Sequence, residues 1–266
     1  MTYFLLSLSL TMLIFFTAFE LERYHRRAKF FRWYAFLRNP KALLSPINAF
    51  YRVFFPNPPF LNLNAFPNHL LLENHKMAIQ QEIGNLLKMN YQFKDFGDIE
   101  TYSKNLARFG WKSFFIKCYD KPTLASEKLL PKTTALIKQC PEVKLAMLSI
   151  LEPGASIKPH FGPSKLCYRY HLCVFCDASE QAFISVGGEK YFWKEGEAVL
   201  FDDTYEHFAM NPTDHLRVVL FCDIERKLPF PFHQVNRKLI DIISQLAVIK
   251  KLQIAANEAM PSLKKE

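Results

Sequence analysis

Four of the eight histidines lie within residues 143–226, next to residues that are typical of strand ends and turns. They are His160, His171, His207 and His215. His160 precedes Phe161-Gly162-Pro163, and His207 follows a short polar run. Iron(II) oxygenases bind their metal through two histidines and usually a carboxylate, and they leave positions open for a cosubstrate and oxygen. His160 and His207 are therefore candidate ligands, although glycine stands where that carboxylate usually lies. The alternative is that both are hydrogen-bonded core residues.

Polar side chains inside apolar strands form a second group of candidates. In the run Tyr168–Phe175, alternation places Arg169 and His171 on one face among apolar residues. Arg217 and Ser149 are embedded in apolar runs in the same way. Buried guanidinium groups require anions, and a dicarboxylate cosubstrate would satisfy both arginines through planar, bidentate pairing. The alternative is internal pairing, for which the nearby carboxylates are Asp202, Asp203 and Glu206.

Strands must position these side chains, and the sequence of residues 143–226 has the pattern of a series of short strands. Runs of β-branched and aromatic residues alternate there with turn formers such as Pro153-Gly154 and Gly187-Gly188. The runs are Lys144–Leu151, Tyr168–Phe175, Ala182–Val186, Lys190–Trp193, Ala198–Phe201 and Leu216–Asp223. We expect an antiparallel sandwich or barrel, and thus a mainly β fold with flanking helices.

The flanking segments show helical periodicity. Apolar residues recur at helical spacing between Asn68 and Met89, and a second helix is predicted from Pro131 to Cys140, with a strand over residues 111–119 between them. After Pro231 an amphipathic helix is predicted within residues 233–266, where it can cover the sheet, touch a membrane or bind a partner. The predicted catalytic domain spans residues 68–232.

The N-terminus predicts a membrane anchor over residues 1–20. Thr2 to Phe19 contains no charged side chain, and its eighteen positions would span roughly 27 Å as a helix. Basic residues follow the apolar run, so the positive-inside rule places the rest of the chain in the cytoplasm. A signal peptide or a buried helix is the alternative. Residues 21–67 are predicted to be a basic, aromatic juxtamembrane segment and linker.

Composition narrows the class of protein further. The 266 residues are 50% apolar and 22% charged, which excludes a disordered chain. The net charge of +9 lies largely beside the apolar run, which favours a membrane over a nucleic-acid partner. The six cysteines are interpreted as reduced core residues because the compartment is expected to be reducing and the single CxxC, Cys173 to Cys176, lies in a predicted strand.

Several spaced motifs in order resemble the aspartyl/asparaginyl β-hydroxylase family of iron(II) and 2-oxoglutarate dioxygenases. They are His160-Phe161-Gly162-Pro163, Tyr168-Arg169-Tyr170-His171-Leu172, Trp193-Lys194-Glu195-Gly196-Glu197, the run Phe201 to His207, and Arg217. Within this family the chain is most similar to bacterial lipid A acyl-chain hydroxylases. That likeness is carried by the N-terminal anchor, Leu44-Ser45-Pro46-Ile47-Asn48, Gly110-Trp111-Lys112-Ser113-Phe114, Gly188-Glu189-Lys190-Tyr191 and Leu220 to Arg226.

The resemblance implies a double-stranded β-helix, with jelly-roll topology, in which His160 and His207 bind Fe²⁺. It also implies that Ser149 and Arg217 hold the distal carboxylate of 2-oxoglutarate, while Arg169 and His171 lie near its metal-bound end. Gly162 implies a two-histidine site whose vacant position water can fill. Asp202 and Asp203 are candidates to orient His207 or a bound water.

The function implied is 2-hydroxylation of a lipid A acyl chain by an enzyme of the bacterial inner membrane. It would use O₂ and 2-oxoglutarate, with ascorbate as a supporting reductant, and no nucleic-acid partner is expected. One alternative is hydroxylation of aspartyl or asparaginyl residues in proteins, and another is a non-catalytic lipid-binding β domain. The sequence leaves the oligomeric state open.

Overall fold

The computed structural model describes residues 44–258, except 90, 100–105, 107–108, 120 and 180, together with 13, 16–17 and 20–21. Among these residues no helix is long and apolar enough to cross a membrane. The predicted anchor, residues 1–20, lies almost entirely outside the described residues.

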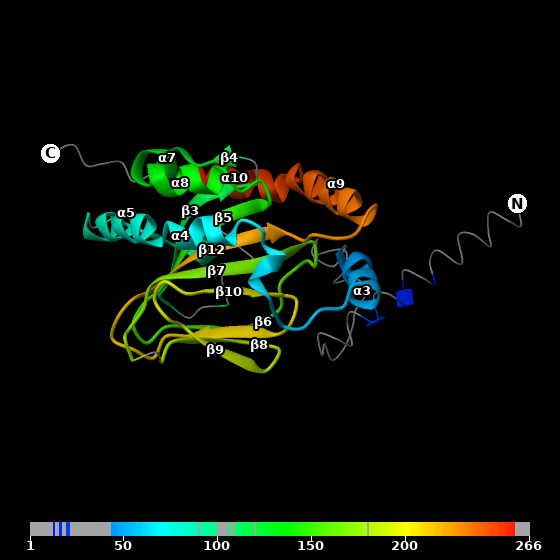
Figure 1. The fold of residues 1–266 in the computed structure, drawn as a ribbon, viewed down its shortest axis with the longest axis horizontal. Helices are drawn as coiled ribbons and strands as arrows, with labels where there is room; N and C mark the ends of the chain where they lie inside the picture. Colours follow the sequence, from blue (N-terminus) through cyan, green and yellow to red (C-terminus); the bar gives the residue numbers. More distant parts are fainter. Residues whose placement is uncertain are drawn as a thin grey trace, which may run out of the picture.

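Two antiparallel sheets pack face to face, and helices cover the outer face of the larger one (Figure 1). The large sheet has the order β1 (Phe60–Leu61), β10 (Ala198–Phe201), β7 (Cys167–Phe175), β12 (Arg217–Glu225), β5 (Val143–Leu151), β3 (Trp111–Cys118) and β2 (Lys94–Asp95), with β4 (Lys121–Pro122) paired to β3. The small sheet has the order β6 (Ser156–His160), β11 (His207–Met210), β8 (Phe183–Val186) and β9 (Glu189–Phe192).

The connectivity of β5 to β12 is that of a jelly roll. The first of these eight strands pairs with the last, β6 pairs with β11, β7 pairs with β10, and β8 pairs with β9. This nested pairing places alternate segments of the chain in opposite sheets. The predicted antiparallel β fold is therefore confirmed, and its eight strands lie between Val143 and Glu225.

The helices lie before, between and after these strands. They are α3 (Ser45–Phe54), η2 (Leu63–Ala65, a 3₁₀ turn), α4 (His69–Asn74), α5 (Lys76–Lys88), α6 (Phe96–Ile99), α7 (Leu124–Leu129), α8 (Pro131–Lys138), α9 (Phe232–Ser244) and α10 (Ala247–Glu258). Pro131 begins α8 as predicted. The single helices expected over Asn68–Met89 and after Pro231 are each two helices, because the chain breaks at His75 and at Gln245–Leu246.

The predicted linker over residues 21–67 is too long. From Ser45 onward the chain belongs to the folded domain, because α3 packs on it, β1 pairs with β10, and Phe66 is fully buried in the main core. Tyr51 of α3 donates a hydrogen bond to Asn236 of α9 at 2.8 Å. The run Phe54-Phe55-Pro56-Asn57-Pro58-Pro59 favours an extended connector because its prolines cannot continue a helix, but the helix before it was not predicted.

Two apolar cores result from strand alternation. Tyr170 and Leu172 of β7 face the helices, where they meet Ile79 and Ile83 of α5. Cys173 of β7 faces the small sheet together with Trp193 and Phe201. The second core, between the sheets, is the layer that contains the polar candidates from β5, β7 and β12.

A buried ion pair ties the turn after β10 to the segment between β6 and β7. Lys165 and Asp202 form this pair, and both side chains are almost completely buried. Asp202 also accepts hydrogen bonds from the backbone N–H of Thr204 at 2.9 Å and from Asn57 at 3.0 Å. Because His207 follows this turn, the pair positions the start of β11.

We predict that Lys165→Met lowers the free energy of unfolding by roughly 3–5 kcal/mol, because Asp202 stays buried without its counter-charge. Urea denaturation of the full chain in mild detergent measures this. The control is Lys138→Met, which removes an exposed ion pair to Glu127 and is expected to cost at most about 1 kcal/mol. Equal losses in the two variants would contradict a structural role for the buried pair.

Candidate functional site

His160 and His207 lie side by side on neighbouring strands. They are directly opposite in the register of β6 and β11, and their ring centroids are 4.0 Å apart. The Nδ1 atom of each ring lies against a carbonyl two residues earlier in the chain, Lys158 O at 2.7 Å and Tyr205 O at 3.0 Å. These bonds place the Nδ1 proton on the carbonyl side, so both Nε2 lone pairs are available to a ligand.

Both imidazoles are held in the neutral form. Burial lowers the pKa of His160 to about 3, with a further contribution from His207, and burial lowers the pKa of His207 to about 4. Neutral imidazole is the form that binds transition metals. The two rings can therefore act as a pair of nitrogen ligands at neutral pH.

The space beside Gly162, two residues after His160, is filled by an acidic group from the turn between β10 and β11. A Cβ atom on Gly162 would lie 2.1 Å from Oδ2 of Asp203, so the Asp203 carboxylate fills the space that a side chain at this position would need. The backbone N–H of Gly162 donates to Asp203 O at 2.7 Å. Among the described residues, no group of three histidine, cysteine or acidic side chains is arranged to hold a metal. The two facing imidazoles offer two nitrogen ligands side by side.

Arg169 is neutralised within the protein. It forms ion pairs with Asp203 at 2.6 Å and with Asp223 at 2.8 Å, and its guanidinium lies 4.1 Å from the centre of the Phe221 ring. Burial alone would lower the pKa of Arg169, but the two carboxylates more than offset it and the pKa is raised. Internal pairing, the alternative considered from the sequence, thus holds for Arg169 and Asp203. Asp202 instead pairs with Lys165.

Asp223 was not predicted, although the sequence contains a signal for it. It lies on the same face of β12 as Arg217, because the two residues are six positions apart along the strand, and it is opposite Arg169. Burial raises its pKa to about 6, and Arg169 opposes this shift. An acidic residue on the buried face of an apolar strand indicates a buried partner of opposite charge.

Arg217 has a different environment, since no carboxylate pairs with it among the described residues. It is 2% exposed, and its contacts are Ser149 O at 3.3 Å and the face of Trp193 at 5.7 Å. Its Nε atom has no hydrogen-bond partner. Burial lowers its pKa to about 10, so it remains charged at neutral pH. Such a group fits an anion between the sheets.

His171 and Ser149 lie on the same inner face. His171 packs between Trp193, Phe201 and Phe221, with ring centroids 5.0–5.5 Å away, and neither ring nitrogen has a hydrogen-bond partner. Burial lowers its pKa well below the usual value, and Arg169 and Arg217 lower it further. Ser149 Oγ accepts a hydrogen bond from Trp111 Nε1 at 3.1 Å. The structure therefore brings all six predicted residues to the space between the two sheets.

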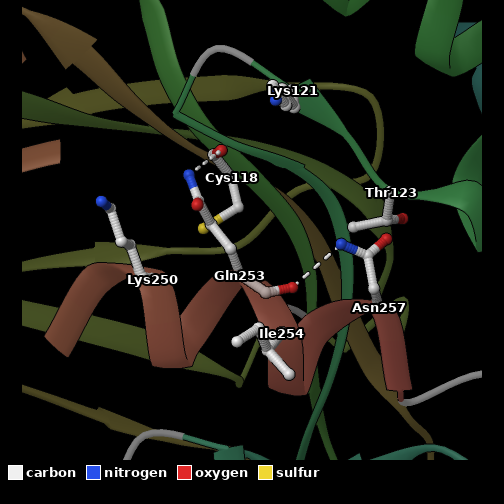
Figure 2. A pocket seen from close by; sticks show the side chains of 7 residues that line it. All are labelled: Cys118, Lys121, Thr123, Lys250, Gln253, Ile254 and Asn257. Atoms are coloured by element: carbon white, nitrogen blue, oxygen red, sulfur yellow. Dashed lines mark hydrogen bonds between the residues drawn. The ribbon is translucent and has the colours of Figure 1, made fainter. Parts of the chain in front are cut away.

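A separate pocket of about 480 Å³ lies between α10 and the β3–β4 edge of the large sheet (Figure 2). Gln253 donates to Cys118 O at 3.3 Å, and Asn257 accepts from Leu124 N at 3.2 Å. These polar groups connect α10 to the sheet, and none of the predicted site residues lines the pocket.

A family model described as aspartyl/asparaginyl beta-hydroxylase matches residues 73–227, which include all the predicted site residues. The chain belongs to this hydroxylase family. An ornithine lipid ester-linked acyl 2-hydroxylase from Rhizobium tropici is 34% identical over 197 residues, which are 73% of this chain and 70% of that protein.

Other relatives match over shorter stretches. Human aspartyl/asparaginyl beta-hydroxylase is 28% identical over 46% of this chain but only 17% of its own length. A prolyl-4-hydroxylase structure from Pseudomonas putida is 12% identical and covers 57% of this chain and 88% of its own, with a TM-score of 0.39, below the range that indicates a shared fold. For this hydroxylase, the jelly-roll assignment thus depends on its own strand pairing.

We predict that Gly162→Ala destabilises the protein by about 1–3 kcal/mol, because the added methyl group displaces the Asp203 carboxylate from Arg169. Thermal or urea unfolding measures this. Gly84→Ala is the control, since its nearest neighbour would be 3.5 Å away and the helix α5 favours alanine. In an Asp203→Ala background the cost of Gly162→Ala should shrink. An unchanged cost there would show that another contact is responsible.

Proposed function

We propose that this chain is an iron- and 2-oxoglutarate-dependent hydroxylase that 2-hydroxylates a fatty acyl chain of lipid A. The observation that carries the proposal is that two neutral histidines and a buried arginine, which no carboxylate of the described residues pairs with, lie in the same layer. The histidines offer nitrogen ligands for a metal, and the arginine offers a binding site for a carboxylate. This class of enzyme must hold both a metal and a dicarboxylate cosubstrate.

The residues divide into two sets. His160 and His207 would hold Fe²⁺ through Nε2, because their Nδ1 atoms are occupied by backbone carbonyls. Arg217 and Ser149 would hold the distal carboxylate of 2-oxoglutarate, and Arg169 and His171 would lie near its other end. When bound, iron, 2-oxoglutarate and O₂ supply the oxidant, with one oxygen atom entering succinate, the other entering the product hydroxyl group, and CO₂ released.

The protein's own part is positioning and exclusion of water. Trp193, Phe201 and Phe221 surround His171, so the interior between the sheets is apolar apart from the polar groups named above. In this low-dielectric environment, charge-assisted hydrogen bonds from Arg217 are stronger than in water. The Asp203 carboxylate, beside His160 and paired with Arg169, can orient a bound water.

The lipid substrate is supported by the Rhizobium tropici relative, which is named as an acyl 2-hydroxylase of ornithine lipid. The apolar run at residues 2–19 and the basic segment after it support an anchor in the bacterial inner membrane, with the catalytic domain in the cytoplasm. Anchoring confines the enzyme and a phosphorylated glycolipid to one surface, which raises their effective concentration. Ascorbate would be a supporting reductant.

Hydroxylation of aspartyl or asparaginyl residues in a protein is the second candidate, favoured by the similarity to the human enzyme. Both candidates use the same iron and cosubstrate residues. They differ in the product, so identification of the hydroxylated molecule separates them.

We predict that His160→Ala and His207→Ala each abolish the appearance of a lipid A species heavier by one oxygen atom. Mass spectrometry of lipids from cells that express each variant measures this, and Fe²⁺ titration of the purified proteins tests the metal. The control is His215→Ala, because His215 lies on the surface with its side chain 73% exposed. If lipid A is unchanged by the intact protein but ornithine lipid or a protein gains oxygen, the substrate assignment is wrong and the chemistry stands.

We predict that Arg217→Met raises the KM for 2-oxoglutarate by roughly 10- to 150-fold, the loss expected for hydrogen bonds between charged groups. The same variant should not lower stability in the absence of cosubstrate, because Arg217 has no internal carboxylate partner. Steady-state kinetics and urea unfolding measure the two effects. Arg237→Met, on the exposed face of α9, is the control. An unchanged KM would remove Arg217 from the cosubstrate site.

A further inference from the structure

Helix α3 and the start of α9 expose apolar side chains that form one continuous surface. Phe50, Val53 and Phe54 follow helical spacing along the outer side of α3, and Val53 and Phe54 are 58% and 63% exposed. The ring of Phe232, at the start of α9, lies 5.9 Å from Phe50. We call this surface the aromatic face, and its members are Phe50, Val53, Phe54, Phe232, Val235 and Ile242.

Helix α9 is rotated so that much of its apolar side faces outward. It buries Asn236, Ile240 and Ser244, two of which are polar, while Val235 and Ile242 are 50% and 62% exposed. At 100° per residue, the centre of the six apolar side chains of α9 is turned about 90° away from the direction of the buried ones. Leu239 and Ile243 are partly buried against the domain, so the apolar side is divided between the domain and the outside. An amphipathic helix whose whole apolar side covered the domain would have the two directions aligned. This orientation is typical of a helix that lies in the plane of an interface.

The charge of this region complements an anionic surface. The segment 227–244, which ends with α9, has three basic residues and one acidic residue, Asp241. Lys227, just before α9, and Lys238, within it, are exposed. Lysine and arginine beside apolar helix faces bind anionic lipid headgroups.

Hydrogen bonds connect helix α3, which carries part of the aromatic face, to the loop that follows His160. Asn48, on the buried side of α3, donates to Pro163 O at 3.0 Å and accepts from the backbone N–H of Lys165 at 2.8 Å. These residues belong to the loop that follows His160. A surface that contacts α3 is therefore close to the loop that follows His160.

We propose that the aromatic face docks on an anionic lipid bilayer. A bilayer is favoured over a protein partner because apolar side chains and lysines occur together here, and because α3 begins immediately after the segment that carries the apolar run and the basic cluster. This proposal rests on the proposed function and adds to it that the domain binds its acyl substrate at a bilayer surface. The competing occupants are a second copy of the chain and the chain's own residues before 44.

The direct test places a tryptophan on the surface of the full chain, reconstituted into vesicles of equal parts phosphatidylcholine and phosphatidylglycerol with brominated acyl chains. Val53→Trp and Ile242→Trp are the probes. Met89→Trp is the control, since Met89 is 67% exposed at the end of α5, on the opposite side of the molecule (Figure 1). The signal is the difference from the parent protein, which removes the emission of the native tryptophans.

We expect bromolipid to quench at least about half of the emission added at Val53 and Ile242, because interfacial helices sit roughly 5–10 Å into the headgroup boundary. Emission added at Met89 should stay unquenched by lipid and accessible to acrylamide. Three outcomes would overturn the proposal: all three probes open to water, equal lipid quenching of all three, or probes at Val53 and Ile242 shielded from both lipid and acrylamide. The last result would identify a protein occupant.

A functional arm separates this proposal from the proposed function. The double variant Val53→Glu/Ile242→Glu should lower kcat/KM at least about tenfold on substrate embedded in vesicles, and leave it unchanged on substrate dispersed in detergent. Met89→Glu is the matched control. Activity that is equal in both media would overturn docking but keep the hydroxylase. Absence of any lipid hydroxylation would refute the proposed substrate, while the quenching result would still decide whether the face binds lipid.

Discussion

Two guanidinium groups buried between facing sheets are the constraint on which the site depends. A buried charge is costly unless it is paired and hydrogen-bonded, so each arginine requires an anion in the same layer. The register of β7 and β12 provides one for Arg169, because Asp223 is its direct cross-strand neighbour. Arg217 lies at the other end of β12, opposite Leu151 of β5, where it donates to Ser149 O and no carboxylate of the described residues pairs with it. The same face of the jelly roll thus carries Arg169, which is paired with carboxylates, and Arg217, which is not. An anionic ligand would be stabilised most beside Arg217.

Gly162 connects this charge arrangement to the histidine pair. Because glycine lacks a Cβ atom, the Asp203 carboxylate can enter beside His160 and reach Arg169. A side chain at this position would have to displace that carboxylate and leave Arg169 with Asp223 alone. The absence of a third protein ligand after His160 is therefore coupled to the neutralisation of Arg169, and the two features cannot be changed independently.

Much of this layer could be predicted from the sequence because strand alternation is a strict rule. The side-chain parity of β7, β5 and β12 placed Arg169, His171, Ser149 and Arg217 on a buried face, and the structure confirms that placement. Their proposed roles came from resemblance, since the parity says nothing about ligands. The pair Arg169–Asp223 was missed because it depends on the register between β7 and β12, which are distant in the chain. The pair Lys165–Asp202 was missed because it joins two connecting segments whose contact depends on the tertiary fold. Helix α3 was missed because its apolar stripe comes just before the prolines that suggested a linker.

The loop between β6 and β7 explains why a surface helix can influence the site. On one side, Asn48 of α3 bonds to this loop, and on the other, Lys165 inserts its ammonium group against Asp202 at the turn before β11. The same loop contains Gly162, and the turn contains Asp203. Each contact is buried or partly buried, so α3, the loop and the two histidine strands form one closely packed unit. A surface that fixes the orientation of α3 would therefore also fix the orientation of the histidine pair, without any hinge between them.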